Sequence, residues 1–230
     1  MNIINKLISK KGIINMVNNL LFSKDHLILL SIFALFLYLC PKLTKNLLPY
    51  SYLIEKVICV FILLEIILEQ YFLIYTHQYS VLTSLPIDIN RFIGYICIAI
   101  LFFKQYQLFN VYFSWSLICS IGNLIFFKHI PSDYPNFLYF EYVCSNIILI
   151  YTNVYLVQVR KFKINRSAIK DNLILSTLYF SFIFLLNTFL GTNYVYIFSS
   201  SNILSIFIFV AITSLTYIPY YFCKDNDSIF

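Results

Sequence analysis

The chain has 230 residues, of which 60% are hydrophobic and only 11% are charged, and its formal net charge is +6. Because soluble domains carry charge on about a quarter of their residues, this chain cannot cover its surface in water. The composition excludes a water-soluble globular domain and indicates an all-α protein embedded in a membrane.

The N-terminal segment, residues 1–25, is expected to lie at the membrane interface. It contains Lys6, Lys10, Lys11 and Lys24 and leads into an apolar stretch. A signal peptide also places lysines before an apolar stretch, but the small-x-small cleavage site is missing here. We therefore expect an uncleaved first helix preceded by an amphipathic interfacial segment.

Seven apolar stretches follow, each close to the ~20 residues that a helix needs to cross the hydrocarbon of a bilayer. Short polar breaks separate them, and prolines fall at or near their predicted ends. The sequence predicts a polytopic bundle of about seven transmembrane helices over residues 26–222, followed by a C-terminal tail at 223–230. The predicted spans are His26–Leu43, Tyr52–Tyr75, Leu85–Phe103, Leu108–Phe127, Phe137–Val159, Leu173–Leu190 and Ser199–Phe222.

Lys and Arg are shared unevenly between the connecting loops, and this bias sets the orientation of a membrane protein. The densest cluster follows the fifth span and contains Arg160, Lys161, Lys163, Arg166 and Lys170. We predict a multi-pass protein of the cell membrane with this loop and the C-terminus in the cytoplasm, although the four lysines before the first span oppose that orientation. The loop can also bind anionic lipid headgroups, whereas nothing in the sequence indicates nucleic-acid binding.

Polar residues within the spans are costly in lipid and by default mark a functional site. If successive spans alternate in direction, one group of them lies toward the outer leaflet. We predict that this group lines an outward-opening pocket for a lipid or a small amphiphile. Its members are Glu65, Glu69, Asp88, Asn90, Arg91, Asn146, Asn187, Asn193 and Tyr194.

Most of these residues also have a structural alternative. Asp88 and Arg91 are three residues apart on one helical face and can neutralise each other. Glu69 can extend toward the interface. Asn146 and Asn187 can be inter-helix hydrogen bonds, worth about 0.6 kcal/mol each.

Two acidic residues differ in how they can be explained. Glu65 is the deepest carboxyl in the predicted spans and is the hardest to assign to structure alone. Glu141, in the outer half of the fifth span, can lie at the interface, where a charge costs little.

The chain contains no motif that dictates a chemistry. We find no Ser-His-Asp, HExxH, P-loop or glycine-rich phosphate signature. The six cysteines include no C-x-x-C pair and have no zinc-site spacing. The sequence therefore predicts no metal and no cofactor.

The segment Asn187–Tyr196 reads N-T-F-L-G-T-N-Y-V-Y, and the segment Leu85–Asn90 reads L-P-I-D-I-N. With the helix from Phe140 to Val157, they make the stretch from about His77 to Ile197 resemble the YwaF-like family of bacterial integral membrane proteins. That family is distantly similar to a eukaryotic transmembrane acyltransferase that remodels ether phospholipids through a cysteine.

The resemblance implies a lipid-facing pocket, and acyl transfer there would need a thiol with a nearby base. Ile87 and Asn90 stand where these relatives carry cysteine, and Asp88 and Asn146 stand where they carry histidine. Cys–His acyl transfer is therefore not expected, although Asp88 can still act as a base in another chemistry.

Two classes of function remain open from the sequence. The first is binding or remodelling of a membrane lipid, with or without catalysis. The second is a small transporter in which Glu65 and Asp88 are proton or cation sites.

Overall fold

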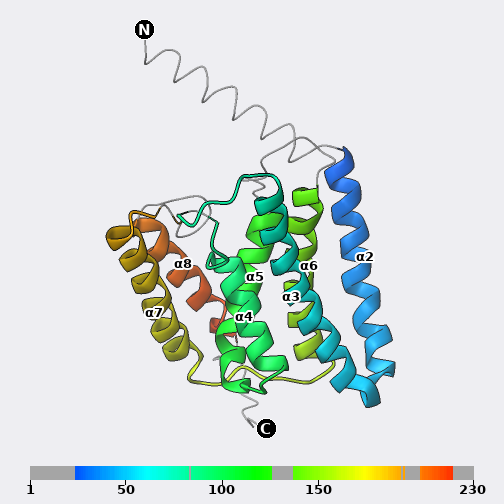
Figure 1. The fold of residues 1–230 in the computed structure, drawn as a ribbon. Helices are drawn as coiled ribbons and strands as arrows, with labels where there is room; N and C mark the ends of the chain where they lie inside the picture. The colour runs from blue at the N-terminus through cyan, green and yellow to red at the C-terminus, as the bar shows by residue number, and fades with distance from the viewer. Residues whose placement is uncertain (1–23, 83, 126–136, 193, 195–202, 220–230) are drawn as a thin grey trace.

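The computed structural model describes residues 24–82, 84–125, 137–192, 194 and 203–219, and these residues form seven α-helices and no strand (Figure 1). Two short 3-10 helices, η1 (Leu48–Tyr50) and η2 (Tyr106–Leu108), precede α3 and α5. The seven helices are α2 (Lys24–Asn46), α3 (Ser51–Tyr75), α4 (Ile89–Leu101), α5 (Phe109–Ile125), α6 (Phe137–Gln158), α7 (Ala168–Phe189) and α8 (Ile203–Leu215).

Successive helices run in opposite directions along one common axis (Figure 1). We call the end of the bundle at which α3, α5 and α7 begin the lower end, as drawn in Figure 1, and the opposite end the upper end. In the described residues, α3, α6 and α7 contain segments long and apolar enough to cross a membrane, and α4 and α8 are shorter apolar helices. The prediction of a helical membrane bundle is confirmed.

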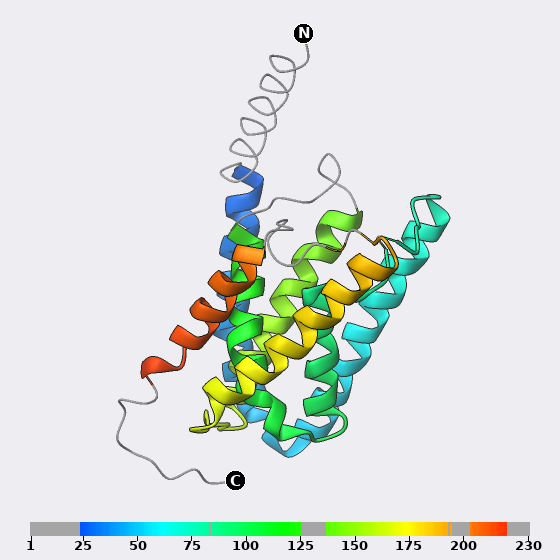
Figure 2. The same ribbon diagram turned by 90° about the vertical axis from the view of Figure 1, so that its left-hand side faces the viewer.

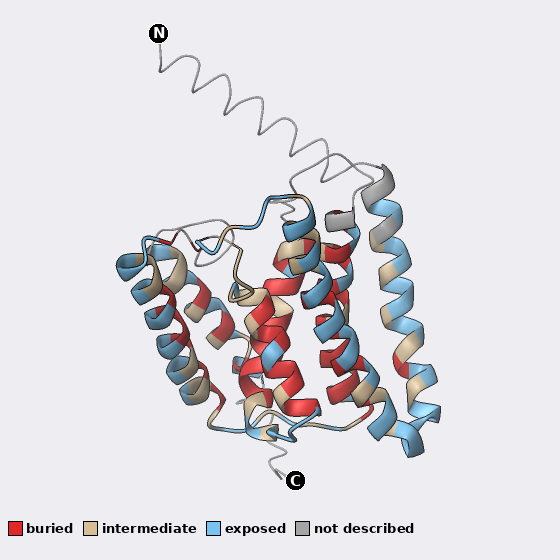
Figure 3. Cartoon of the chain, viewed as in Figure 1, coloured by how far each residue is buried: buried red, intermediate tan, exposed pale blue. Residues whose placement is uncertain are grey.

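The buried core runs through the middle of the bundle, along α4, α5 and α6 (Figure 3). Its largest fully buried side chains are Trp115, Tyr112 and Tyr155. α2 and α3 pack on one side of this centre, and α7 and α8 pack on the other; Figure 2 shows α7 and α8 inclined relative to α2. Large apolar side chains on α2, α3, α7 and α8 remain exposed, as expected for helices that face lipid.

One close approach between helices uses a glycine. A Cβ atom added to Gly94 of α4 would lie 3.2 Å from Cγ2 of Ile62 on α3. Few contacts of this kind are available to a chain with four glycines. Aromatic and branched aliphatic side chains therefore provide most of the contact area between the helices.

Several helix boundaries differ from the prediction. α4 begins at Ile89 rather than Leu85, because Pro86 lies in a turn and Asp88 takes the N-cap position. α7 begins at Ala168 rather than Leu173, so its first turn includes Asp171. The prediction assigned the polar residues of this first turn to a loop, although polar residues suit a helix that starts at the membrane interface.

α8 ends at Leu215, well before the predicted Phe222, which lies outside the described residues. Pro41 was expected near the end of the first span, but it lies inside α2, five residues before the helix ends. The predicted interfacial segment before Lys24 and the tail at 223–230 also lie outside the described residues.

Four helices end at a residue with positive φ. Gly191 (φ 62°) follows α7, as its glycine predicts, but His77 (56°), Lys104 (57°) and Lys161 (61°) follow α3, α4 and α6. The N–H of the residue after Lys104 donates to Ala99 O at 3.0 Å, and that after Lys161 to Leu156 O at 3.0 Å. These bonds satisfy carbonyls that the helix end leaves free, at the cost of placing side chains in a region that favours glycine.

Candidate functional site

One guanidinium group lies at the centre of three carboxylates in the upper half of the bundle. Arg91, in the first turns of α4, contacts Glu65 (Nη1–Oε1, 2.6 Å) and Glu69 (Nη2–Oε2, 2.7 Å) of α3. It also contacts Glu141 of α6 (Nη2–Oε1, 2.5 Å). Glu65 and Glu69 are four residues apart and therefore share one face of α3. We call these four residues the Arg91 cluster.

The Arg91 cluster is largely withdrawn from solvent. Arg91 and Glu65 are each 7% exposed and Glu141 is 9% exposed, whereas Glu69 is half-buried at the edge. Three carboxylates around one guanidinium leave an excess of negative charge if all are ionised. Because uncompensated charge is costly inside a membrane protein, we expect protons or a cation to balance part of this excess.

Several structural alternatives for these residues are resolved by these contacts. Arg91 makes its ion pairs with carboxylates on other helices, and none of those described is with Asp88. Glu69 turns toward Arg91 rather than only toward the interface. The carboxylate of Glu141 is buried against the guanidinium and paired with it, so Glu141 is part of the polar cluster rather than a separate exposed charge.

Three asparagines from three helices meet beside the Arg91 cluster. Asn123 of α5 donates its Nδ2 to Asn90 Oδ1 (2.9 Å) and to Asn146 Oδ1 (3.2 Å). Asn90 and Asn146, on α4 and α6, are linked directly by a longer Nδ2–Oδ1 contact of 3.5 Å. Asn146 is fully buried, whereas the other two are half-buried. We call this group the amide triad.

A cavity of about 10 Å³ lies between the Arg91 cluster and the amide triad. Its lining includes Glu65, Asn90, Arg91, Gly94 and Ser145. This space is comparable with that of one water molecule. The polar groups are therefore packed closely together, and an acyl chain does not fit between them in this conformation.

Asp88 lies at the entrance to this region. It occupies the N-cap position of α4, where a carboxylate is favoured by the helix dipole. Its carboxyl is close enough to interact electrostatically with Cys119 of α5, Tyr142 of α6 and Tyr179 of α7. Asp88 as a whole residue is nevertheless exposed.

Asn187 and Tyr194 form a separate arrangement at the end of α7. The Asn187 side chain donates to Tyr194 O (2.9 Å), and its Oδ1 accepts from Tyr194 N (3.0 Å) and from the Thr192 hydroxyl (2.8 Å). The Tyr194 hydroxyl accepts from Leu85 N (3.0 Å) and donates to Val81 O (3.1 Å). These hydrogen bonds join the end of α7 to the segment that leads into α4.

The nine predicted site residues therefore separate into distinct groups. Glu65, Glu69 and Arg91 are together, Asn90 and Asn146 are together beside them, and Asp88 is at the entrance. Asn187 and Tyr194 hold the connection rather than joining the cluster. Asn193 lies outside the described residues.

Sequence reasoning missed two members of this region. Asn123 was not selected, although it is an amide within an apolar stretch and the rule that selected Asn146 applies to it equally. Glu141 was noticed but assigned to the interface, and spacing along the chain does not show that Arg91 lies opposite.

Other buried polar contacts hold the bundle together away from this site. Glu55 of α3 pairs with Arg160 after α6 (Oε1–Nε, 2.9 Å). Trp115 of α5 donates its Nε1 to Asn172 Oδ1 of α7 (2.7 Å), and Asn172 in turn donates to Thr213 Oγ1 of α8 (3.0 Å). These contacts connect helices that are far apart in sequence.

In the part of the chain that the structure describes, no group of three or more His, Cys, Asp or Glu side chains is arranged to hold a metal ion. The carboxylates that gather in the upper half do so around the guanidinium of Arg91. The region can therefore exchange protons or hydrogen-bond a polar ligand through amides and carboxyls.

Comparison with known proteins identifies the chain at the level of its family. The model of the TMEM164 family, a family of transmembrane proteins, matches residues 21–224. No curated protein and no solved structure matches the chain. Because the family model covers most of the chain, including all seven described helices, the chain belongs to the TMEM164 family.

Proposed function

We propose that this TMEM164 family protein binds the polar part of a membrane lipid or small amphiphile at the upper end of the bundle. The observation that carries the proposal is the convergence of the amide triad, from three helices, near the exposed residue Asp88. Polar groups of this kind are costly in a membrane and are kept where they bind or react.

The chemistry of the amide triad suits an uncharged polar group. Each asparagine offers two donors and an acceptor, and Asn90 and Asn123 are only half-buried. A ligand that reaches them can exchange the asparagine–asparagine bonds for bonds to its own ester, hydroxyl or phosphodiester oxygens. Asp88 can bind a cationic or hydroxyl group at the entrance.

The same residues support binding without acyl transfer. Asn90 and Asn146, which stand where the resembling families carry cysteine and histidine, are in contact in this protein. Amides at these positions can hold a lipid ester but cannot attack it as a thiolate would. The nearby Cys119 is only 1% exposed, so its thiol is not presented to a ligand at the entrance.

We further propose that the upper end faces away from the cytoplasm of a cell membrane. The basic residues Arg160, Lys161 and Lys163 follow α6 at the lower end. Positively charged loops remain in the cytoplasm. The proposed binding site then opens outward, toward the outer leaflet.

The test is the lipid that remains with the purified protein. Wild-type protein extracted in native-membrane nanodiscs should retain one lipid class above its proportion in the bulk membrane, as measured by mass spectrometry. Asn123→Ala should lower that enrichment several-fold, because it removes the central donor of the triad. The matched control is Asn46→Ala, which truncates an exposed amide at the lower end of α2.

The proposal fails if wild type and Asn123→Ala carry the same lipids in bulk proportion. Thermal melting of both variants in detergent separates loss of binding from loss of fold. A variant that melts as wild type but loses the enriched lipid supports a binding role for the triad.

One observation favours a second candidate, a small proton or cation transporter. The Arg91 cluster holds more carboxylates than its guanidinium can balance, and groups of this kind form proton relays in membrane proteins. Reconstituted wild-type protein would then dissipate a proton or cation gradient across liposomes. The Glu65→Gln variant would not dissipate it, whereas the control variant Glu55→Gln, at the lower end, would. If liposomes that contain the wild-type protein keep their gradient, transport of the ions tested is excluded.

A further inference from the structure

The lower end of the bundle contains a second polar hollow that the proposed function does not use. It is a groove of about 670 Å³, formed by the α4–α5 connection, the start of α5, the α6–α7 connection and the start of α7. Residues that define it include Lys104, Asn110, Ser167, Asp171 and Ile174. We call it the lower groove. Its volume is typical of sites for small ligands.

The polar floor of the lower groove is fixed by its own hydrogen bonds. Asn110 Nδ2 donates to Asp171 Oδ2 at 2.9 Å, and the Ser167 hydroxyl donates to the same oxygen at 2.8 Å. Asn110 Oδ1 accepts from Asn165 N at 3.0 Å. These bonds connect α5, α7 and the loop before α7, so the groove does not depend on a ligand for its shape.

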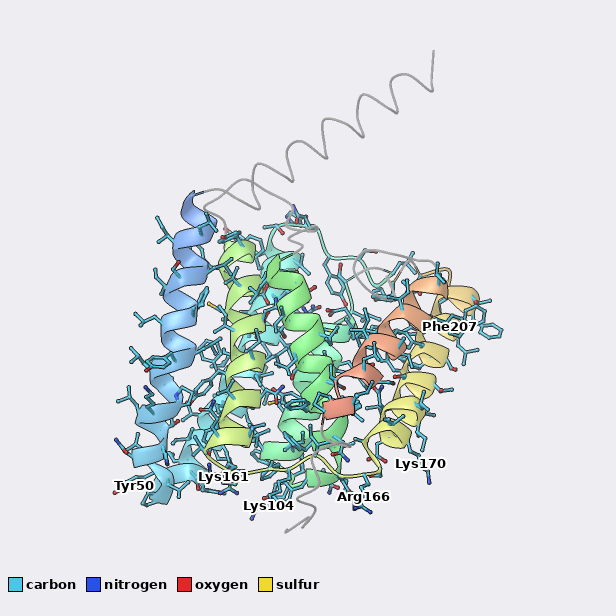
Figure 4. The ribbon with its side chains drawn as sticks, turned by 180° about the vertical axis from the view of Figure 1, so that it is seen from behind. Tyr50, Lys104, Lys161, Arg166, Lys170 and Phe207 are labelled. Carbon is cyan, nitrogen blue, oxygen red and sulfur yellow. The ribbon has the colours of Figure 1, made fainter. Side chains whose placement is uncertain are left out.

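Three cations lie at the same end of the bundle as this groove. Lys104 lines it, and Arg166 and Lys170 adjoin its lining residues Asn165, Ser167 and Asp171 in sequence; Figure 4 shows all three at the same end of the molecule. Lys104 also holds a positive φ of 57°, a conformation that glycine would adopt at lower cost. Against these cations stands Asp171, whose Oδ2 accepts two hydrogen bonds. The local field therefore favours an anion.

The charge around the lower groove is part of a separation along the whole molecule. Every described Lys and Arg side chain apart from Arg91 belongs to the lower half. Those side chains are Lys42, Lys45, Lys56, Lys104, Arg160, Lys161, Lys163, Arg166 and Lys170. The preference of Lys and Arg for cytoplasmic loops would by itself make this end of the bundle basic. It would not produce a groove whose polar floor is fixed by hydrogen bonds.

An apolar path leads from the lower groove along the outside of α7. Ile174 lines the groove and is 50% exposed. Leu178, Phe182 and Leu185 are also exposed and follow it at helical spacing on the same face. A ligand with a charged head and an acyl chain can therefore occupy the groove and this face together, whereas a soluble anion would use only the groove.

We infer that the lower groove binds the phosphate-bearing headgroup of an anionic phospholipid, with its acyl chains along the exposed face of α7. The inference concerns the opposite end of the bundle from the proposed site, and it is independent of what binds there. Lys104 and Lys170 supply charge to the phosphate, and the floor of Asn110 and Ser167 supplies polar contacts to the rest of the headgroup.

The experiment compares two double variants that remove the same amount of positive charge from the same end. Lys104→Glu with Lys170→Glu changes the groove, and Lys42→Glu with Lys45→Glu changes α2, which does not line it. Each protein is reconstituted in nanodiscs of phosphatidylcholine with a minor fraction of phosphatidylglycerol, re-extracted in mild detergent, and its retained lipids are measured by mass spectrometry. Wild type and the α2 variant should retain phosphatidylglycerol several-fold above its fraction, and the groove variant should retain it at the bulk fraction.

Three results would overturn the inference. Equal loss of phosphatidylglycerol from both variants would mean that the end attracts anionic lipid without a defined site, and no loss from either would mean that the groove is not involved. Displacement of the lipid by excess inorganic phosphate would also contradict a site that depends on acyl chains. Thermal melting gives an independent readout, since added phosphatidylglycerol should raise the Tm of wild type and the α2 variant but not that of the groove variant.

Discussion

Arg91 is the side chain on which the upper half of the bundle depends most. Its guanidinium contacts three carboxylates on two other helices, and it is almost completely buried. Removal of one partner from a buried ionic group leaves the others uncompensated, which costs about 3–5 kcal/mol in proteins. Arg91 therefore has a structural role whatever ligand the upper end binds.

We expect Arg91→Leu to lower the melting temperature in detergent strongly or to prevent recovery of folded protein. Arg160→Leu is the matched control, because Arg160 pairs with the single carboxylate Glu55 and its side chain is 29% exposed. That variant should be destabilised less.

A combined variant tests whether unbalanced charge is the reason that Arg91→Leu destabilises the protein. Arg91→Leu together with Glu65→Gln, Glu69→Gln and Glu141→Gln should melt at a higher temperature than Arg91→Leu alone, because no carboxylate is then left unpaired. If the combined variant is no more stable than the single one, the cost of Arg91→Leu arises from lost side-chain contacts rather than from unbalanced charge.

The sequence identified most residues of this region but not their partners. Glu65, Glu69 and Arg91 stand out because charged residues are rare in apolar stretches. Spacing along one helix suggested Asp88 as the partner of Arg91, whereas its partners lie on α3 and α6. Contacts between helices depend on how the helices are rotated about their axes, and a single sequence does not determine that.

At the scale of the element, the helix ends are set by backbone conformation as much as by composition. Apolar length predicted all seven helices, since a helix is the only open-ended element that can satisfy its backbone in lipid. The starts of α4 and α7 were less predictable. Asp88 and Asp171 are both polar residues near a helix start, but only Asp171 lies within the helix.

Gly191 gives a direct test of this backbone conformation. Its φ is 62°, and a Cβ atom added there would meet no atom within 4 Å. Gly191→Ala should therefore lower the free energy of unfolding by about 1–2 kcal/mol through backbone strain alone. Thermal or denaturant melting in detergent measures this change.

His77→Gly supplies the opposite change at the equivalent position after α3, where φ is 56°. It should leave stability unchanged or raise it, because glycine adopts positive φ without strain. If Gly191→Ala melts as wild type, the turn after α7 does not hold the conformation described here.

At the scale of the whole molecule, the two ends of the bundle differ in charge. Among the side chains that the structure describes, Arg91 is the only Lys or Arg in the upper half. The upper half also contains the carboxyls Glu65, Glu69, Asp88 and Glu141. The remaining described Lys and Arg side chains belong to the lower half (Figure 4). The sequence predicts only part of this separation, because Lys6, Lys10, Lys11 and Lys24 precede the first span on the side opposite the basic loop.

Cysteine labelling should establish the orientation that this separation predicts. Gln78→Cys places a thiol in the exposed turn after α3 at the upper end, and Lys161→Cys places one in the exposed loop after α6 at the lower end. A membrane-impermeant maleimide should label the first in intact cells and the second only after permeabilisation. The opposite pattern would invert the orientation, and labelling of both from one side would contradict the alternation of helices.

The contact between Arg91 and α3 also has a consequence for biosynthesis. Glu65 emerges from the ribosome 26 residues ahead of the arginine that neutralises it, so α3 on its own presents Glu65 and Glu69 to the translocon without their partner. We therefore expect α3 and α4 to partition into the bilayer as one helical hairpin rather than in succession. A nascent chain that stops before Arg91 should integrate α3 less completely than one that continues through α4.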